Sequence, residues 1–378
     1  MRILQITGDW KWTGPAAPML ELLLALRARG HEVWLACPPP PPDQTGIEAR
    51  ALAAGVEPAL RLARGRGVRW WRDARDARRL REWCDAEKLE IVHAWHTRDH
   101  VLALRALARR RRAREAALVR SVKSAEAIAA TPWNRWLYGP ASDGLLCVSP
   151  ESARRNARLR GGRALLGAFG AVDTARFRPA PRRAALAAEL GLLPRHRVVG
   201  VVARAQRHRR FDLLLEATRR LALSDPDLRL LVIGRGTHIE ETAHEPARRL
   251  GIEERVVFAG YRGDDYTDAL CLCDVLVLLV PGSDGGCRAV LEAAACGIPA
   301  VTTRRGALPE IVRDGDTGIL VDEDPASLAA ALGALLADGG RRARMGGAAR
   351  QRALDRFTPA RLAEAVERLY RESLARRR

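Results

Sequence analysis

The chain has 378 residues, and 47% of them are apolar, which is enough for two domain cores of ordinary size. No apolar run reaches the roughly 18 residues of a transmembrane helix, and the first residues lack the charged and apolar regions of a signal peptide. The net charge of +19 is compatible with nucleic acid, an anionic membrane surface or an anionic substrate. We expect a cytoplasmic protein of two domains, with peripheral attachment to the inner face of the membrane as an open alternative.

The basic residues are densest at residues 109–112 and Arg114, at the end of a helical stretch. Cations at a helix C-terminus are favourable without any ligand, because they complement the helix dipole. The rival interpretation is contact with an anionic lipid leaflet or a phosphorylated acceptor. Aromatic residues make up only 5% of the chain and do not alternate with the basic ones. A stacking surface for nucleic acid is therefore not expected.

The seven cysteines are odd in number and mostly scattered. Cys271 and Cys273 form a C-x-C pair, but no second pair follows at the spacing of a zinc site. We therefore expect reduced, buried or semi-buried thiols and no metal.

In the first half of the chain, short apolar runs alternate with amphipathic stretches, which predicts βα units and a parallel sheet. The expected strands are residues 3–7, 33–36, 91–94, 118–121 and 145–148, with helices such as 16–29 and 98–110 between them. Residues 38–42 are a proline run, which predicts a loop.

The pattern resets around residues 178–195, where Pro179, Pro181 and Pro194 interrupt it. We place the first domain at 1–180 and the second at 181–378, with the last helix free to pack back on the first domain. The second half predicts strands at 198–202, 228–233, 256–258, 275–279, 300–303 and 319–321, then helices at 325–336, 341–356 and 359–374. Two doubly wound, Rossmann-like parallel sheets place ligands at the carboxyl ends of the strands.

The most informative segment is PGSDGGCRAVLEAAACGIPA, residues 281–300, which follows the strand 275–279. Gly285 and Gly286 leave backbone amides bare where a helix begins, an arrangement that binds anions or sugar hydroxyls. Asp284 precedes this helix and Glu292 lies two turns into it, so each carboxylate can accept hydrogen bonds from paired hydroxyls. In isolation they would be an N-cap and a surface glutamate, but Glu292 interrupts an apolar run. The helix is expected to end near Cys296, with Gly297 as its C′ residue.

This segment resembles the E-x7-E segment of the retaining glycosyltransferases of family 4, also called glycosyl transferases group 1. The family pattern E-G-F-G-x-x-x-x-E-A-x-A-x-G-x-P-V is matched at Gly285, Glu292, Ala293, Ala295, Gly297 and Pro299. It departs at Asp284, where the family has Glu, and at Gly286 and Cys287, where it has Phe and Gly. The resemblance implies a GT-B fold, in which two Rossmann-like domains face each other across a cleft.

Supporting segments of the second domain resemble the same family. Arg204 and Arg209 stand where the family has the Arg and Lys of G-R-x-x-x-x-K-G-x-D, which hold the donor diphosphate and offset leaving-group charge. Gly234 belongs to a lone G-x-G without the third glycine of a dinucleotide fingerprint, so it predicts a tight turn, which in the family borders the nucleotide. Tyr261 and Arg262 follow a V-x-F-x-G match, which implies contact with the nucleobase.

The first domain resembles the family more loosely. Gly14 is the single glycine of a loop that is glycine-rich in the family and closes over the donor. The stretch IVHAWHTR resembles D-I-V-H-x-H, in which we interpret His93 as structural and His96 as facing donor or acceptor. The family often has a histidine after the next strand, where this chain offers Lys123.

The resemblance implies transfer of a sugar, with retention, from a nucleotide-sugar donor to a hydroxyl of a glycan or lipid-linked acceptor, with no cofactor and no metal. Lipopolysaccharide or lipid-linked glycan synthesis is the expected setting. The implied catalytic residues are Arg204, Arg209 and Asp284; the implied donor-binding residues are Gly14, Gly234, Tyr261, Arg262, Gly285, Gly286, Cys287 and Glu292; His96 and Lys123 are expected on the acceptor or sugar side. Rival hypotheses are a GT-B epimerase or phosphorylase, a catalytically silent nucleotide-sugar or anionic-glycan binding protein, and a plain polyanion binder.

Overall fold

The computed structural model describes residues 1–12, 16–63, 70–282 and 286–376. Contacts between residues divide them into two compact units. The first unit comprises residues 1–170 together with the C-terminal residues from Pro359 onward, and the second comprises 171–282 and 286–358. The division thus falls ten residues before the boundary expected from the sequence, and the last helix belongs to the first unit.

The first unit is built on a seven-stranded, wholly parallel sheet in the order β3-β2-β1-β4-β5-β6-β7. Its strands are β1 (Arg2–Ile6), β2 (Glu32–Cys37), β3 (Pro58–Arg61), β4 (Ile91–Ala94), β5 (Ala117–Val122), β6 (Gly144–Cys147) and β7 (Ala164–Gly167). The five expected strands are confirmed, and β3 and β7 are added at the two edges. The strand order reverses between β1 and β4, which makes this the switch point of the sheet.

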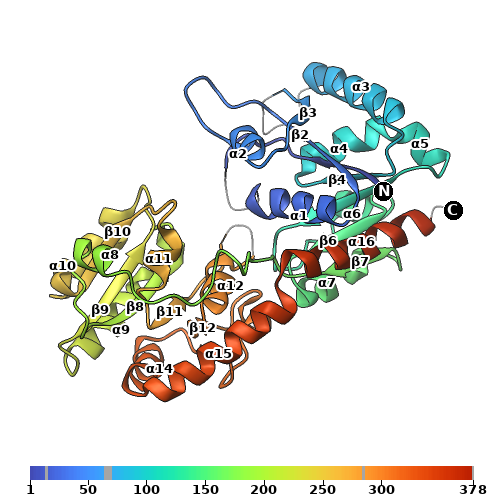
Figure 1. Ribbon diagram of the computed structural model, residues 1–378. Coiled ribbons are helices and arrows are strands. Elements are labelled where there is room, and N and C mark those ends of the chain that lie inside the picture. The colour runs from blue at the N-terminus through green and yellow to red at the C-terminus, as the bar shows by residue number, and fades with distance from the viewer. Residues whose placement is uncertain (13–15, 64–69, 283–285, 377–378) are drawn as a thin grey trace. The chain divides into compact units, whose positions relative to one another are not determined.

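Helices cover both faces of this sheet. They are α1 (Ala16–Ala28), α2 (Ile47–Ala53), α3 (Trp70–Ala86), α4 (Thr97–Ala106), α5 (Ala108–Arg112), α6 (Pro132–Tyr138), α7 (Pro150–Asn156) with the 3-10 turn η1 (Ala157–Leu159), and α16 (Pro359–Ala375). Ile3 packs with α1 and α16, whereas its neighbour Leu4 packs with α3 and α4. Side chains alternate along a strand, so each face has its own core. In Figure 1 the red helix α16 lies beside the green strands β6 and β7.

The second unit repeats the scheme with six parallel strands in the order β10-β9-β8-β11-β12-β13. The strands are β8 (Arg197–Val202), β9 (Leu228–Ile233), β10 (Val256–Gly260), β11 (Val275–Leu278), β12 (Ala300–Thr303) and β13 (Gly318–Val321). All six expected strands are confirmed. The order reverses between β8 and β11, so the switch point of this sheet lies there.

The helices of the second unit again cover both faces. They are α8 (Ala184–Glu189), η2 (Arg207–Arg209), α9 (Phe211–Ala222), the π-helical η3 (Glu240–His244), α10 (Glu245–Arg249), η4 (Glu253–Arg255), α11 (Tyr266–Leu270), α12 (Arg288–Ala295), α13 (Leu308–Ile311), α14 (Pro325–Ala337) and α15 (Gly339–Arg356). Val199 and Val201 face α9 and α14, whereas Val198 faces α8 and α11. The strands are nearly continuous apolar runs because helices bury both of their sides. Each unit is therefore a Rossmann-like, doubly wound domain.

Helix α16 is held to the first sheet by a buried polar network. The side chain of His93 is fully buried; its Nδ1 lies 2.7 Å from the Tyr370 hydroxyl and its Nε2 lies 2.8 Å from the Ser121 hydroxyl. Gln5 Nε2 donates to the same Tyr370 hydroxyl at 3.2 Å. Burial lowers the pKa of His93 to about 3. His93 is therefore a neutral, structural histidine, as the sequence predicted.

This pKa predicts a pH dependence of stability. Between pH about 6.5 and about 3, the unfolded chain binds a proton at His93 that the folded chain does not. The contribution of His93 to the free energy of unfolding should therefore be complete above pH about 6.5. Below that pH it should decrease by up to about 1.4 kcal/mol per pH unit. Urea unfolding at several pH values gives the free energy of unfolding as a function of pH, and this free energy should fall less steeply on acidification for His93→Gln than for the wild type. The exposed His238→Gln control should show the same pH dependence as the wild type. An equal pH dependence in all three proteins would contradict the assignment.

Candidate functional site

The carboxyl edge of the second sheet gathers the arginines expected to hold a diphosphate. Arg204 follows β8 and is exposed, and Arg209 lies in η2 on the same connection. Arg209 Nη1 donates to the carbonyl of Val280 at 2.8 Å, just past the end of β11. This hydrogen bond joins the connections that leave β8 and β11, the two strands of the switch point. Both guanidinium groups thus belong to the edge where doubly wound sheets bind ligands.

The Gly234-Arg235-Gly236 segment fits closely against the loop that carries Arg204. A Cβ atom at Gly234 would lie 2.3 Å from the carbonyl oxygen of Ala203, and one at Gly236 would lie 2.4 Å from that of Ala205. Gly234 has a φ of +140° and donates its N–H to Gly260 at 2.8 Å. The two glycines therefore permit close approach of two backbones, as a tight turn after β9 requires.

Helix α12 presents Glu292 from its second turn. Its carboxylate is 6% exposed, accepts a hydrogen bond from the Tyr266 hydroxyl at 2.6 Å and pairs with Arg288 at 3.3 Å. Burial, followed by the negative charge of Glu292, raises the pKa of the Tyr266 hydroxyl well above its usual value. Tyr266 therefore stays a proton donor that fixes one carboxylate oxygen. The sequence analysis missed Tyr266 and Arg288; only the spacing of four between Arg288 and Glu292 signals either.

The start of α12 is only partly described. Cys287 is its buried N-cap in the left-handed region, with φ of 50°, and Gly286 beside it is half-buried. Asp284, Gly285 and Gly14 lie outside the described residues. At the other end, Cys296 is the C-cap and Gly297 follows with φ of +75°, as expected for a C′ glycine.

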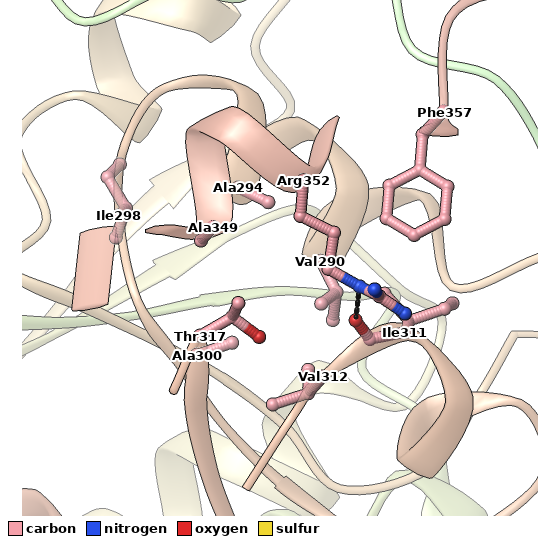
Figure 2. A pocket seen from close by; sticks show the side chains of 10 residues that line it. All are labelled: Val290, Ala294, Ile298, Ala300, Ile311, Val312, Thr317, Ala349, Arg352 and Phe357. Atoms are coloured by element: carbon pink, nitrogen blue, oxygen red, sulfur yellow. Dashed lines mark hydrogen bonds between the residues drawn. The ribbon is translucent and has the colours of Figure 1, made fainter. Parts of the chain in front are cut away.

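Two arginines of α15 hold neighbouring segments by their carbonyls. Arg350 donates to the carbonyls of Ala295 at 2.6 Å, Phe177 at 2.8 Å and Thr174 at 3.1 Å, so it supports the end of α12. Arg352 donates to the carbonyls of Ile311 at 2.9 Å and Glu310 at 2.7 Å, so it ties α13 to α15; the first of these bonds is drawn in Figure 2. The small pocket beside it, lined by α12, α13 and α15, has a volume of about 10 Å³, room for at most about one water molecule. It is a packing gap between these helices and not a ligand site.

The two residues expected near a nucleobase differ in their surroundings. Tyr261 is 60% exposed, with the guanidinium of Arg235 lying 5.0 Å from its ring centroid. Arg262 donates to Asp265 and Glu189, both at 2.8 Å, and to the Ala259 carbonyl at 2.9 Å. The hydrogen bond to Asp265 is the main cause of the raised pKa of Arg262. Arg262 thus holds its own loop together, and contact of either residue with a base stays a prediction.

In the first unit, His96 and Lys123 lie side by side at the carboxyl edge of the sheet. His96 is the N-cap of α4, and Lys123 follows β5. The Nδ1 of His96 lies 3.1 Å from Asp99, and its Nε2 lies 2.8 Å from Lys123 Nζ. The Asp99 carboxylate can only accept a hydrogen bond, which favours the tautomer with the proton on Nδ1; Nε2 then accepts from the Lys123 ammonium group. His96 therefore lies between the carboxylate of Asp99 and the ammonium group of Lys123 and contacts both. Thr7, which follows β1 at the switch point, has its hydroxyl 3.3 Å from His96 Nδ1.

The described residues contain no group of three or more His, Cys, Asp or Glu side chains that could hold a metal ion. No helix in the described ranges is long and apolar enough to span a bilayer. All seven cysteines are free of disulfide bonds and buried, as the sequence predicted.

Two doubly wound parallel sheets, with candidate ligand residues at the carboxyl edge of each, define a protein of the GT-B class. The profile of the family Glycosyl transferases group 1 matches residues 183–352, and that of Glycosyltransferase Family 4 matches residues 13–164. The chain belongs to the family 4 glycosyltransferases.

Curated relatives support this membership. A GDP-mannose-dependent alpha-(1-6)-phosphatidylinositol monomannoside mannosyltransferase of Mycolicibacterium smegmatis is 38% identical over 206 residues, which cover 51% of this chain and 53% of that protein. A D-inositol 3-phosphate glycosyltransferase of Streptomyces bingchenggensis is 33% identical over 306 residues, 77% of this chain and 64% of that protein. The matched parts thus span from about half to just under two thirds of these relatives.

Solved structures show the same fold. HepE of Anabaena, in complex with UDP, superimposes with a TM-score of 0.79 at 18% identity, over 97% of this chain and 99% of that chain. A glycosyltransferase of Rickettsia africae gives a TM-score of 0.82 at 15% identity, over 99% and 98%. At these identities the comparison concerns the fold alone.

The contact between Gly236 and Ala205 gives a prediction on stability. Gly236→Ala forces a Cβ against backbone, and such overpacking costs typically about 1–3 kcal/mol. Gly263→Ala is the matched control, because nothing lies within 4 Å of a Cβ there. Urea unfolding should show a lower free energy of unfolding for Gly236→Ala and no comparable loss for Gly263→Ala. Equal stability of the two variants would show that the loop carrying Arg204 is not held as described.

Proposed function

We propose that this protein transfers a sugar from a nucleotide-sugar donor to a hydroxyl acceptor with retention of the anomeric configuration. The observation that carries the proposal is the carboxylate of Glu292, fixed by Tyr266 and Arg288 on a helix that begins beside the switch point of the second sheet. Tyr266 engages one carboxylate oxygen and Arg288 the other, but each oxygen can accept more than one hydrogen bond, so Glu292 can still accept from a ribose diol. Family membership and the UDP named with the HepE structure support a nucleotide as the occupant.

The arginines of the β8 connection account for the charge of the donor. Arg204 is exposed, so it is free to reach a diphosphate, and Arg209 is oriented by its bond to Val280. Preorganised cations offset the negative charge that develops on a leaving diphosphate, which is the electrostatic form of catalysis that needs no metal. Asp284 would position the donor sugar, and the leaving phosphate would take the acceptor proton. In such a reaction the acceptor attacks from the side of the sugar on which the phosphate leaves, which is called a front-face route. This route requires no side-chain nucleophile.

The acceptor is proposed to be an anionic, phosphate-bearing glycan or lipid-linked compound of the cell envelope. Lys123 and His96 supply a cation and a ring at the carboxyl edge of the first sheet, and cations there favour an anionic substrate. The names of the two relatives above contain phosphatidylinositol monomannoside and D-inositol 3-phosphate, which are of this chemistry. An acceptor in the membrane would bring the protein to the inner face as a peripheral protein.

Thermal unfolding with nucleoside diphosphates and nucleotide sugars, with and without magnesium, tests the donor site. A ligand at 100 times its Kd should stabilise the folded protein by about 2.7 kcal/mol. We expect one nucleotide to raise Tm independently of metal. No stabilisation by any of them would argue against the donor site.

Variants then test the chemistry. Arg204→Ala and Glu292→Gln should each lower kcat/KM for sugar transfer by about 100-fold, the scale of removing one preorganised charged contact. Arg207→Ala is the control, because Arg207 is exposed on the same connection but pairs with Glu241. Nucleotide binding without turnover in the wild type would favour the silent-binder hypothesis. Unchanged transfer by Arg204→Ala and Glu292→Gln would refute the assigned roles.

A further inference from the structure

A strongly basic pocket lies at the amino edge of the first sheet, opposite the carboxyl edge that carries His96 and Lys123. It has a volume of about 580 Å³. We call it the arginine pocket; its charged residues are Arg111, Arg112, Arg114, Asp143, Arg163 and Arg376. These residues end α5, precede the starts of β5, β6 and β7, and follow α16. The starts of parallel strands form the amino edge, so the pocket is separate from His96 and Lys123 at the carboxyl edge.

Among the described residues that line the arginine pocket, Asp143 has the only carboxylate, and it is already engaged. Asp143 accepts hydrogen bonds from Arg111 Nε and Nη2, both at 3.1 Å, and from the N–H of Leu118 at 2.7 Å. Arg111 is buried and also donates to the Pro140 carbonyl at 3.3 Å. This pair therefore builds the wall of the pocket and neutralises only one of its five arginines.

The remaining arginines leave an excess of positive charge. Arg112, Arg163 and Arg376 are exposed, and none of them forms an ion pair with a carboxylate of the described residues. The C-terminal ends of α5 and α16 each contribute at most about half a negative charge, together about one, against the three positive charges of Arg112, Arg163 and Arg376. Helix dipoles alone therefore do not account for the gathering of these side chains.

A buried arginine outside the pocket lining, Arg160, holds the segments that carry Asp143 and Arg163. Arg160 is 1% exposed and donates to the carbonyls of Ser142 at 3.2 Å and of Asp143 and Ala164 at 2.9 Å. These bonds tie together the segments that begin β6 and β7. Burial, followed by the charge of Arg163, lowers the pKa of Arg160 to about 10. Asp143 and Arg163 of the pocket therefore lie on segments that are tied together, and Arg160 adds a further positive charge near Arg163.

We propose that the arginine pocket binds a ligand that carries two or more phosphate groups. Guanidinium groups from three separate segments suit the several oxygens of such a ligand, because each forms charge-assisted, often forked hydrogen bonds with phosphate. A volume of 580 Å³ falls in the range of small-molecule sites, roughly 300–1,000 Å³, and exceeds the size of a single phosphate ion. The source is either a soluble phosphorylated metabolite or a phosphorylated lipid headgroup.

The first experiment is calorimetric titration of the full chain with inorganic pyrophosphate at physiological salt. The variant R112Q/R163Q/R376Q should bind at least about tenfold more weakly than the wild type, since each charged hydrogen bond contributes about 1.5–3 kcal/mol. The control R75Q/R78Q/R81Q removes the same charge from the exposed face of α3 in the same unit and should bind as the wild type does. The three substitutions of exposed side chains in the pocket variant leave the buried Arg111 and Arg160 in place, so folding should be retained.

A second comparison separates this pocket from the proposed donor site. Pyrophosphate binding that is lost in Arg204→Ala but kept in R112Q/R163Q/R376Q would overturn the proposal. So would equal losses in the pocket variant and the α3 control, because binding would then follow net charge only. Failure of sugar transfer leaves this result untouched, since the pocket is tested by binding alone.

Vesicle sedimentation then identifies the source of the phosphates. Vesicles of phosphatidylcholine with a phosphatidylinositol phosphate are compared with vesicles of phosphatidylcholine with phosphatidylserine. The amount of phosphatidylserine is chosen so that both vesicles have the same total charge. Binding only to the former, with competition by pyrophosphate and loss in R112Q/R163Q/R376Q, assigns the pocket to a lipid headgroup. Pyrophosphate binding without vesicle binding assigns it to a soluble metabolite. Binding to neither probe would overturn the proposal.

Discussion

The reversal of strand order in each parallel sheet is the constraint on which the rest of the structure depends. Crossovers between parallel strands are right-handed. When a chain adds strands first on one side of its first strand and then on the other, the two connections that leave the central strands run to opposite faces of the sheet, and a gap remains between them. In this protein the gaps follow β1 and β4 in one unit and β8 and β11 in the other. Arg204, Arg209, His96 and Lys123 owe their positions to this topology and not to proximity in sequence.

The periodicity of the chain was sufficient to predict the central strands, because buried parallel strands are short apolar runs between helices. It missed β3 and β7, which are edge strands of only four residues each, too short to show a clear pattern. The expected helix 98–110 is two helices, which meet at Leu107. The Glu292 contact with Tyr266 joins residues 26 apart, and no spacing rule reaches that far. The roles of Arg204, Arg209 and Asp284 in catalysis remain predictions.

Most of the arginines that give this chain its charge are used in construction. Arg160, Arg350 and Arg352 are held by backbone carbonyls, and each ties together segments that secondary structure leaves apart. A guanidinium group has five donors in a rigid fork, so one side chain can satisfy several carbonyls at the end of a helix or strand. Net charge is therefore a poor guide to ligands here. The informative arginines are those that neither a carboxylate nor a carbonyl network holds.

The return of α16 to the first sheet has a consequence for biosynthesis. Tyr370 contacts Gln5 across 365 positions of the chain. The whole second unit lies between these two residues in the sequence. A ribosome delivers the seven strands of the first sheet and α1 early, but α16, which shares one face of that sheet with α1, emerges only after the second unit. The second unit can fold as it emerges, whereas the first waits with part of the apolar surface around Ile3 uncovered. Domains usually fold in order of synthesis; in this protein the domain that starts first is completed after the second.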